Sequence, residues 1–265
     1  MKMIGSVFYF VVFASYMIGI VQCLGYIETN FKEFVNFEGK RFDGSCCDKP
    51  GFWGSWGAKK DTCTDECDHN FVICMGNGTQ SSSMSACEFG QQEIDHVGGN
   101  KITFNSHVGT ADNPIKFQFG TWPGVVKLKI DVRDRDGDSE FDFVDHYEYQ
   151  YNTRDLQREI DAPEKSLVLT GSRTRFDMKL KVYCDLHYYG PDCETYCIET
   201  DDETGHYRCD PATGAKICKL GWKGDDCLTN IDDCVGNRCL LWGHVHRRSK
   251  FLQLRLSTRP NRFYL

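Results

Sequence analysis

The 265-residue sequence lacks most of the features on which enzymes and membrane-embedded proteins depend. It has no Gly-rich phosphate loop and no His-Glu-x-x-His zinc motif, and its eight histidines are scattered. After residues 1–23, no apolar run approaches the roughly 18 residues that a membrane-spanning helix needs. Helical periodicity is scarce too, with one candidate short helix at 65–75. We therefore expect a non-enzymatic protein built mainly from strands.

Basic residues are in short supply over most of the chain. The net charge is −7, yet the last 26 residues hold six basic residues and no acidic one. Without these six and Lys2, 24 basic residues stand against 38 acidic ones. An acidic body argues against nucleic acid as a partner and suits a cation-binding extracellular module better.

Cysteine, in contrast, is abundant, with 15 residues. Residues 1–23 resemble a secretory signal peptide, because a positive charge precedes an apolar run and Val21 and Cys23 fit a cleavage site. The alternative is an N-terminal membrane anchor. Loss of Cys23 leaves an even number of cysteines, which is typical of disulfides in an oxidising compartment. Asn77 begins an Asn-Gly-Thr acceptor sequence for N-glycosylation, so we expect it on a surface loop.

Residues 24–181 are long enough for one domain, and apolar and polar residues alternate there with period two in several segments. Such alternation marks half-buried antiparallel strands, and several in series indicate a β-sandwich. The alternation ends near Tyr183, where cysteine, glycine and tyrosine become frequent. The alternating segments are 115–119, 126–132, 147–151 and 178–182.

A ladder of six cysteines follows, from Cys184 to Cys227, at spacings C-x8-C-x3-C-x11-C-x8-C-x8-C. A stretch this short buries too little apolar surface to hold itself together, so we expect disulfides to do so. The spacing alone permits fifteen pairings. Zinc is disfavoured because the ladder has no paired C-x2-C spacings. Six upstream cysteines are also expected to be oxidised, with their pairing left open: Cys46, Cys47, Cys63, Cys67, Cys74 and Cys87.

Two sets of motifs resemble one known family. The ladder, with Tyr188-Tyr189-Gly190, Gly205-His206-Tyr207-x-Cys209 and Gly221-Trp222-x-Gly224-x-x-Cys227, resembles the DSL module of the Delta and Serrate/Jagged Notch ligands. Upstream motifs such as Asp65-Glu66-Cys67-Asp68 and Cys87-Glu88-Phe89-Gly90 resemble the N-terminal C2-like domain of these ligands, with the nearest likeness to the Serrate/Jagged type. The resemblance covers about residues 24–239.

The resemblance implies a mostly β protein, with a C2-like antiparallel β-sandwich over 24–181 and a small disulfide-rich, EGF-like DSL module over 182–227. Residues 228–239 resemble the start of a further EGF-like domain that is incomplete, because two of its six cysteines are present. We expect the basic tail 240–265 to be disordered, although it could also bind a matrix. The disulfides implied by the resemblance are Cys184–Cys193, Cys197–Cys209 and Cys218–Cys227.

The function implied by the resemblance is recognition of EGF repeats of a Notch receptor outside the cell, which regulates cell–cell signalling and cell fate. A chain without a membrane anchor is expected to act as a soluble co-ligand or antagonist, whereas a longer single-pass chain would act from the cell membrane. The loop closed by Cys197 and Cys209 is pre-organised for binding, and exposed aromatic residues in so small a module are common binding anchors. The expected receptor-binding residues are Tyr188, Tyr189, Asp201, Asp202, Glu203, Thr204, His206 and Tyr207.

The loop also departs from the pattern of the family, which usually has a phenylalanine where this chain has Thr204. Basic residues that usually follow the third cysteine of the module are replaced by Ile198-Glu199-Thr200. The loop is therefore more acidic and less apolar than in the family. We predict weaker or differently placed receptor contact through it. Trp222 is expected to pack on the disulfides instead.

A second candidate site is the acidic segment 131–144, which we expect to form a loop at one end of the sandwich. Asp134, Asp136 and Asp142 resemble the third calcium loop of C2 domains, and Ca²⁺ takes six to eight oxygen ligands. Asp95 or Asp112 could add further carboxylates. Such a site could dock anionic phospholipid, which gives a competing function as a secreted Ca²⁺-dependent membrane or matrix adhesion module. The alternative is a solvated acidic loop.

Overall fold

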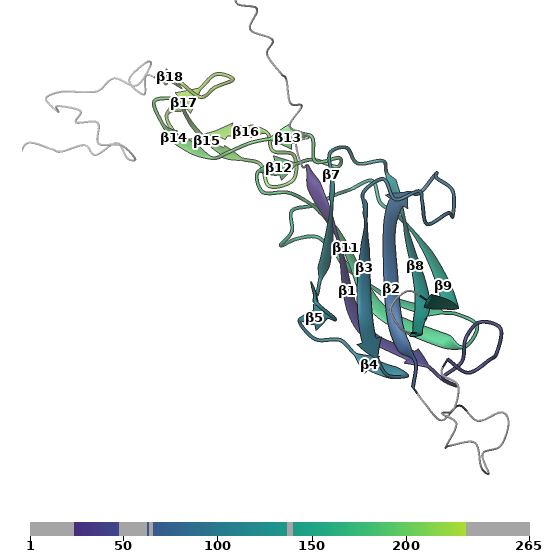
Figure 1. Ribbon diagram of the computed structural model, residues 1–265. Helices are drawn as coiled ribbons and strands as arrows, with labels where there is room; N and C mark the ends of the chain where they lie inside the picture. The colour runs from purple at the N-terminus through teal and green to yellow at the C-terminus, as the bar shows by residue number, and fades with distance from the viewer. Residues whose placement is uncertain (1–23, 48–62, 64–65, 137–139, 232–265) are drawn as a thin grey trace, which may run out of the picture.

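The structure, a computed structural model, describes residues 24–47, 63, 66–136 and 140–231. All regular elements in these residues are strands, and no helix among them is long and apolar enough to cross a membrane. The expected signal peptide and basic tail lie outside the described residues, as does most of the expected partial EGF-like segment. The chain forms an elongated molecule in which a small module extends from one end of a β-sandwich (Figure 1).

Two antiparallel sheets form the sandwich, which confirms the expected fold class. One sheet has the order β10-β11-β1-β4, and β7 also pairs with β1; the other has the order β3-β2-β8-β9. The strands are β1 (Gly25–Asn36), β2 (Asp68–Asn77), β3 (Gly90–Gly98), β4 (Lys101–Thr103), β7 (Ile115–Phe119), β8 (Val125–Asp136), β9 (Glu140–Asn152), β10 (Glu164–Thr170) and β11 (Thr174–Cys184). A short hairpin of β5 (His107–Val108) and β6 (Ala111–Asp112) lies outside the two sheets.

The core between the two sheets follows from the alternation in the sequence. Along β11 and β7, apolar side chains are buried while their polar neighbours face outward, as period-two strands require. Phe31, Phe34, Phe71 and Phe176 meet edge to face or tilted at the centre, with ring centroids 4.7 to 6.5 Å apart. These rings come from strands of both sheets, so their contacts hold the two sheets together at the centre of the sandwich.

The short helix expected at 65–75 is wrong, because Asp68–Asn77 forms strand β2. Every residue from His69 to Gly76 is buried, since β2 lies between β3 and β8 in its sheet. One face of β2 packs on the core, and its other face is covered by the segment that leads to Cys87, which is bonded to Cys74. A strand buried on both faces has no period-two pattern, so its apolar spacing resembles that of a helix.

Short hairpins build the small module. They are β12 (Tyr188–Tyr189) with β13 (Thr195–Tyr196), β14 (Thr200–Asp202) with β15 (Gly205–Cys209) and β16 (Lys216–Cys218), and β17 (Trp222–Lys223) with β18 (Thr229–Asn230). Cys184, the last residue of β11, is also the first cysteine of the module. Its amide donates to the carbonyl of Gln157 at 2.9 Å, and the Leu156 amide donates to the carbonyl of Pro191 at 3.1 Å. The two domains are therefore joined without a linker.

Candidate functional site

Three disulfides hold the small module, and they are the three pairs that the resemblance implies. Cys184 bonds Cys193, Cys197 bonds Cys209, and Cys218 bonds Cys227. The six upstream cysteines pair as Cys46–Cys63, Cys47–Cys67 and Cys74–Cys87. The module has few buried apolar side chains apart from its cysteines, so these bonds stabilise the backbone that presents its surface residues.

The loop between Cys197 and Cys209 contains the β14–β15 hairpin, whose turn is capped by Asp202. Its carboxylate accepts the Thr204 hydroxyl at 2.6 Å and the Thr204 amide at 2.8 Å. These two hydrogen bonds, first the hydroxyl and then the amide, lower the pKa of Asp202. Asp202, Glu203 and Thr204 are all exposed at this turn. Thr204 therefore lies at the tip of a fixed hairpin, open to a partner.

One face of the hairpin carries a connected polar and aromatic surface. Asp201 and His206 are directly opposite each other in the β14–β15 register, and the His206 Nδ1 lies 2.8 Å from the Asp201 carboxylate. The hydrogen bond with His206 is the main reason that the pKa of Asp201 is lowered, and Lys219, 3.3 Å away, adds to it. The imidazole of His206 stacks on the Trp222 indole with centroids 3.6 Å apart. We call Asp201, His206, Lys219 and Trp222 the histidine face.

Tyr207 does not belong to this surface, because neighbouring residues of a strand point to opposite faces. Its ring lies under the Lys216 ammonium at 4.7 Å, and Lys216 pairs with Asp226 at 2.9 Å. The hydrogen bond with Asp226 raises the pKa of Lys216. The predicted binding residues thus divide between two faces of one hairpin sheet, and a single flat partner can contact one of them.

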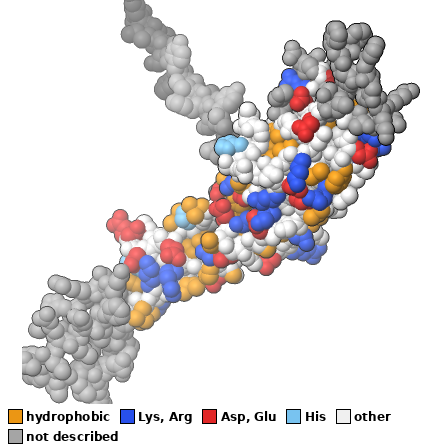
Figure 2. Space-filling view, turned by 90° about the horizontal axis from the view of Figure 1, so that it is seen from below, with side chains coloured by type: hydrophobic (Ala, Val, Ile, Leu, Met, Phe, Trp, Pro, Cys, Tyr) orange, Lys and Arg blue, Asp and Glu red, His pale blue; other side chains and the backbone are white. Residues whose placement is uncertain are grey.

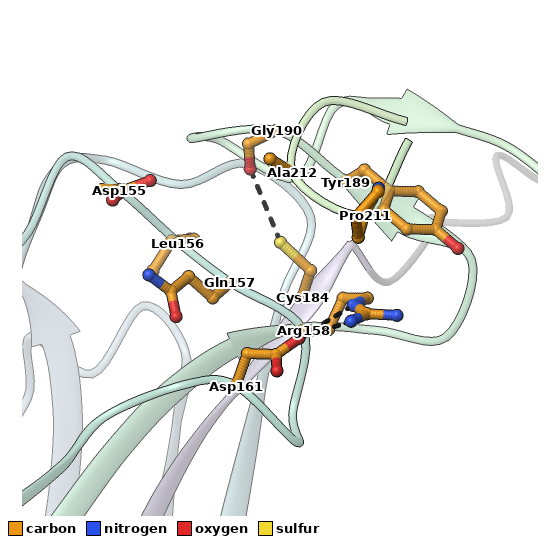
Figure 3. Close-up of a pocket in the computed structure, with 10 residues that line it drawn as sticks. All are labelled: Asp155, Leu156, Gln157, Arg158, Asp161, Cys184, Tyr189, Gly190, Pro211 and Ala212. Atoms are coloured by element: carbon orange, nitrogen blue, oxygen red, sulfur yellow. Dashed lines mark hydrogen bonds and ion pairs between the residues drawn. The ribbon is translucent and has the colours of Figure 1, made fainter. Parts of the chain in front are cut away.

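Two tyrosines expected to bind the receptor also differ from each other. Tyr188 is only 6% exposed and packs with Cys184 and Cys193 in the continuous core, so its prediction as a surface anchor is wrong. Tyr189, the next residue in β12, points the other way and lines a groove of about 440 Å³ at the junction of the two domains (Figure 3). The Arg158–Asp161 ion pair, 2.5 Å long, lies on the sandwich side of the groove.

Trp222 makes a contact that the sequence does not indicate. Its indole stacks on the imidazole of His206 and is half-buried in the histidine face. Trp222 lies in the motif Gly221-Trp222-x-Gly224-x-x-Cys227, but the spacing of this motif does not show that the indole reaches His206. Lys219 was missed because nothing near it in the sequence marks its contact with Asp201.

The acidic segment is not a loop as expected, since 131–136 belongs to β8 and 140–144 to β9. Asp134, Asp136 and Asp142 do meet, at the end of the sandwich away from the small module, and we call them the acidic cluster. They surround the guanidinium of Arg41. Its Nη2 lies 2.6 Å from Asp136, its Nη1 lies 2.6 Å from Asp142, and its Nε lies 3.8 Å from Asp134.

These oxygens do not fit a resident calcium ion as they stand, because guanidinium nitrogens already contact them. Asp95 and Asp112, the two further carboxylates that the sequence offers, do not join the cluster: Asp95 pairs with Arg135, and Asp112 lies 3.6 Å from His107. Asp134 also lies near the sulfurs of Cys47 and Cys67, but these are joined in a disulfide and are not metal ligands.

The glycosylation candidate Asn77 is the last residue of β2, at the start of a tight turn. Its side-chain oxygen accepts the Thr79 hydroxyl at 3.0 Å and the Thr79 amide at 3.1 Å. Gly78 lies between them, against the side chain of Val125. The acceptor sequence is thus held in one conformation at the surface, where an N-linked glycan requires it.

Charged side chains of both signs are interspersed over the sandwich and the small module on the face shown in Figure 2. No broad single-sign surface appears on that face.

Comparison with known proteins decides the family. The model of the N terminus of the Notch ligand C2-like domain matches residues 24–182, and the model of the Delta serrate ligand module matches residues 184–230. The chain belongs to the Delta/Serrate family of Notch ligands. The second model begins at Cys184, the residue that the structure shares between strand β11 and the first disulfide of the module.

Relatives of both branches of the family are similar to the chain. It is 31% identical to "Delta-like protein A" of Danio rerio over 214 residues, covering 78% of the chain and 26% of the relative. It is 29% identical to "Protein jagged-1" of Homo sapiens over 211 residues, covering 77% and 16%. These identities do not favour the Jagged type over the Delta type. The chain spans about a quarter or less of the length of these relatives.

A solved structure agrees with the order of the domains. "Structure of Drosophila C2-DSL-EGF1" matches with a TM-score of 0.64 at 26% identity, covering 78% of this chain and 87% of that one. The sandwich and the module are therefore a C2-like domain and a DSL module.

Proposed function

We propose that this chain is an extracellular ligand that binds EGF repeats of a Notch receptor through its C2-like domain and DSL module together, with no chemistry of its own. The observation that carries the proposal is the match of both family models, in order, to two domains that share Cys184. A junction without a linker supports a joint contact, because both surfaces are pre-organised and little entropy is lost on binding.

Within the DSL module, the histidine face is the proposed receptor contact. It combines an aromatic anchor, Trp222, with the hydrogen-bonding groups of His206, Asp201 and Lys219, the composition typical of binding hot spots. Loss of one such anchor costs about 2 kcal/mol or more, which is roughly a 30-fold change in Kd. The exposed turn at Thr204 lies beside this face and extends it.

The test is a binding assay of the purified secreted chain against immobilised Notch EGF repeats, with and without Ca²⁺. W222A is expected to weaken binding by roughly 30-fold. Y207A is the matched control, because Tyr207 lies on the opposite face of the same hairpin sheet. Equal losses in the two variants would exclude the histidine face, and no binding by the parent chain would exclude the function itself.

The proposed location is outside the cell. Six disulfides among the described residues support an oxidising compartment. Whether the ligand activates or blocks its receptor is proposed to depend on attachment: a chain fixed to a cell membrane can pull on the receptor, and a soluble one competes for it. A Notch reporter assay that compares the soluble chain with the same chain fused to a membrane anchor separates these outcomes, because only the fusion should activate.

A second candidate function, adhesion to an anionic phospholipid surface, is favoured by exposed aromatic side chains at the far end of the C2-like domain. Phe42 and Phe143 are 53% and 43% exposed and lie 5.3 Å apart, close to the acidic cluster. Binding to phosphatidylserine vesicles with and without Ca²⁺ tests it. F42S should release the chain from vesicles, and V168S, which changes an exposed residue of β10, should not.

A further inference from the structure

The cation at the centre of the acidic cluster belongs to the protein itself. We infer that Arg41 takes the place of a calcium ion there, so that the far end of the C2-like domain holds its conformation without metal. The inference rests on the register of the β8–β9 hairpin, the oxygen atoms around Arg41 and the disulfide-bonded segment that carries it.

The register of the hairpin makes a cation necessary. Asp134 and Asp142 are directly opposite each other, and Asp136 follows Asp134 by two residues, so all three side chains lie on one face of the hairpin. Like charges directly opposite each other destabilise a strand pair. Asp134 is 1% exposed, so water alone cannot screen its charge, and the amide of Asp68 donates to it at 2.9 Å.

The atoms around Arg41 form the oxygen set that a calcium ion prefers. Besides the three carboxylates, the backbone carbonyl of Cys47 accepts a hydrogen bond from Arg41 Nη2. Calcium requires such oxygens at 2.3–2.6 Å. The guanidinium nitrogens already lie 2.6 Å from Asp136 and from Asp142, so an ion at the required distance would overlap them. Arginine also supplies hydrogen bonds in a planar fork that matches carboxylates.

The segment that carries Arg41 is itself fixed. The Arg41 amide donates to the carbonyl of Ser45 at 2.9 Å, and the Arg41 carbonyl accepts from the Gly44 amide at 3.0 Å. Gly44 has a φ of +88°, a conformation that glycine adopts readily. The adjacent residues Cys46 and Cys47 are both in disulfides. These contacts hold the Arg41 backbone in place, so the guanidinium, with 16% of the side chain exposed, is pre-organised against the three carboxylates.

Arg41 consequently joins the segment after β1 to the β8–β9 hairpin. The neighbouring backbone bond from the Phe42 amide to the Phe143 carbonyl, at 3.1 Å, strengthens the same junction. A metal ion would make the stability of this junction depend on the calcium concentration, whereas the guanidinium of Arg41 holds the junction together at any calcium concentration. Arg41 carries one positive charge against three carboxylates, and the partial exposure of Asp136 and Asp142 lets water screen the remainder.

The test measures thermal unfolding and calorimetric Ca²⁺ binding of the full secreted chain in EDTA and in millimolar Ca²⁺. The parent chain should show the same Tm in both buffers and no heat assigned to this end. R41Q should lose a few degrees in EDTA and regain them in Ca²⁺, because the change frees the oxygens for the ion. R175Q is the control: Arg175 pairs with Glu33 and Asp177 elsewhere on the sandwich, so its loss should create no calcium response.

Three results would overturn the inference. The first is a parent chain whose Tm rises with Ca²⁺ and falls back when D134N and D136N are introduced. The second is an R41Q chain as stable as the parent in EDTA, and the third is an R41Q chain that Ca²⁺ fails to stabilise. If R41Q is not secreted, calorimetry of the parent chain decides the question alone. A stoichiometric heat of Ca²⁺ binding that D142N abolishes refutes the inference, and the absence of such a heat supports the inference.

Discussion

Acidification should destabilise the C2-like domain through one buried histidine. His69 on β2 is completely buried, and its ring packs edge-on against Phe34 at 4.8 Å. Burial lowers the pKa of His69 from 6.5 to about 4, opposed in part by the carbonyl of Arg133. Asp134, its register partner on β8, already accepts the Asp68 amide and lies beside Arg41. The positive charge of Arg41 beside Asp134 offsets the attraction that this carboxylate would exert on a protonated His69.

The direction and size of the effect follow from these two pKa values. Between pH 6.5 and pH 4 the unfolded chain holds a proton on His69 that the folded chain excludes, so the free energy of unfolding falls as the pH falls. Each pH unit costs about 1.4 kcal/mol, which gives about 3 kcal/mol over the whole interval. Above pH 6.5 this contribution to stability is fully present.

Denaturant unfolding at several pH values between 7.5 and 4.5 measures this loss. H69L should flatten the pH dependence, because leucine has no proton to take up, even if its stability at neutral pH is lower. H107L is the matched control, since it removes an exposed histidine of the same domain instead of a buried one. If H69L lost as much stability as the parent chain between pH 6.5 and pH 4.5, the argument from burial would be refuted.

Three further predictions concern the surface. T204F should strengthen Notch binding by restoring an aromatic side chain at the exposed hairpin tip, and an unchanged Kd in the binding assay would show that the tip makes no contact. N77Q should remove a glycan, seen as a gel shift that peptide-N-glycosidase produces in the parent chain and not in the variant. G205A should lower the stability of the DSL module by about 1–3 kcal/mol in denaturant unfolding, because the added methyl would lie 2.6 Å from the ring of Tyr207; equal stability would contradict this.

Much of the sandwich could be predicted because many of its strands bury one face only. Phe117 and its alternating neighbours in β7, and Leu180 with its neighbours in β11, point to the core as period two requires. Strand β2 could not be predicted in this way. Its second face is covered by the segment before Cys87, where the Lys129 ammonium donates to the carbonyls of Ser81, Ser83 and Ala86, and no local pattern indicates such a cover.

The candidate sites show the same limit. The sequence identifies the three carboxylates of the acidic cluster, but their counter-cation Arg41 is about a hundred residues earlier, and no spacing rule joins them. The sequence also identifies the tyrosines of the DSL module without showing which is buried. Tyr188 and Tyr189 are adjacent, and only the pairing of β12 with β13 decides that Tyr188 points inward.

The sharing of Cys184 between β11 and the first disulfide has a mechanical consequence. If a receptor held the C2-like domain while the chain was drawn from the far end of the DSL module, tension would enter the sandwich along β11. That strand lies antiparallel to β1 over its whole length, from Thr174 opposite Asn36 to Cys184 opposite Gly25. Hydrogen bonds perpendicular to the tension would then be loaded in shear, all at once rather than one after another. The geometry favours a ligand that stays folded while the force is passed to its partner.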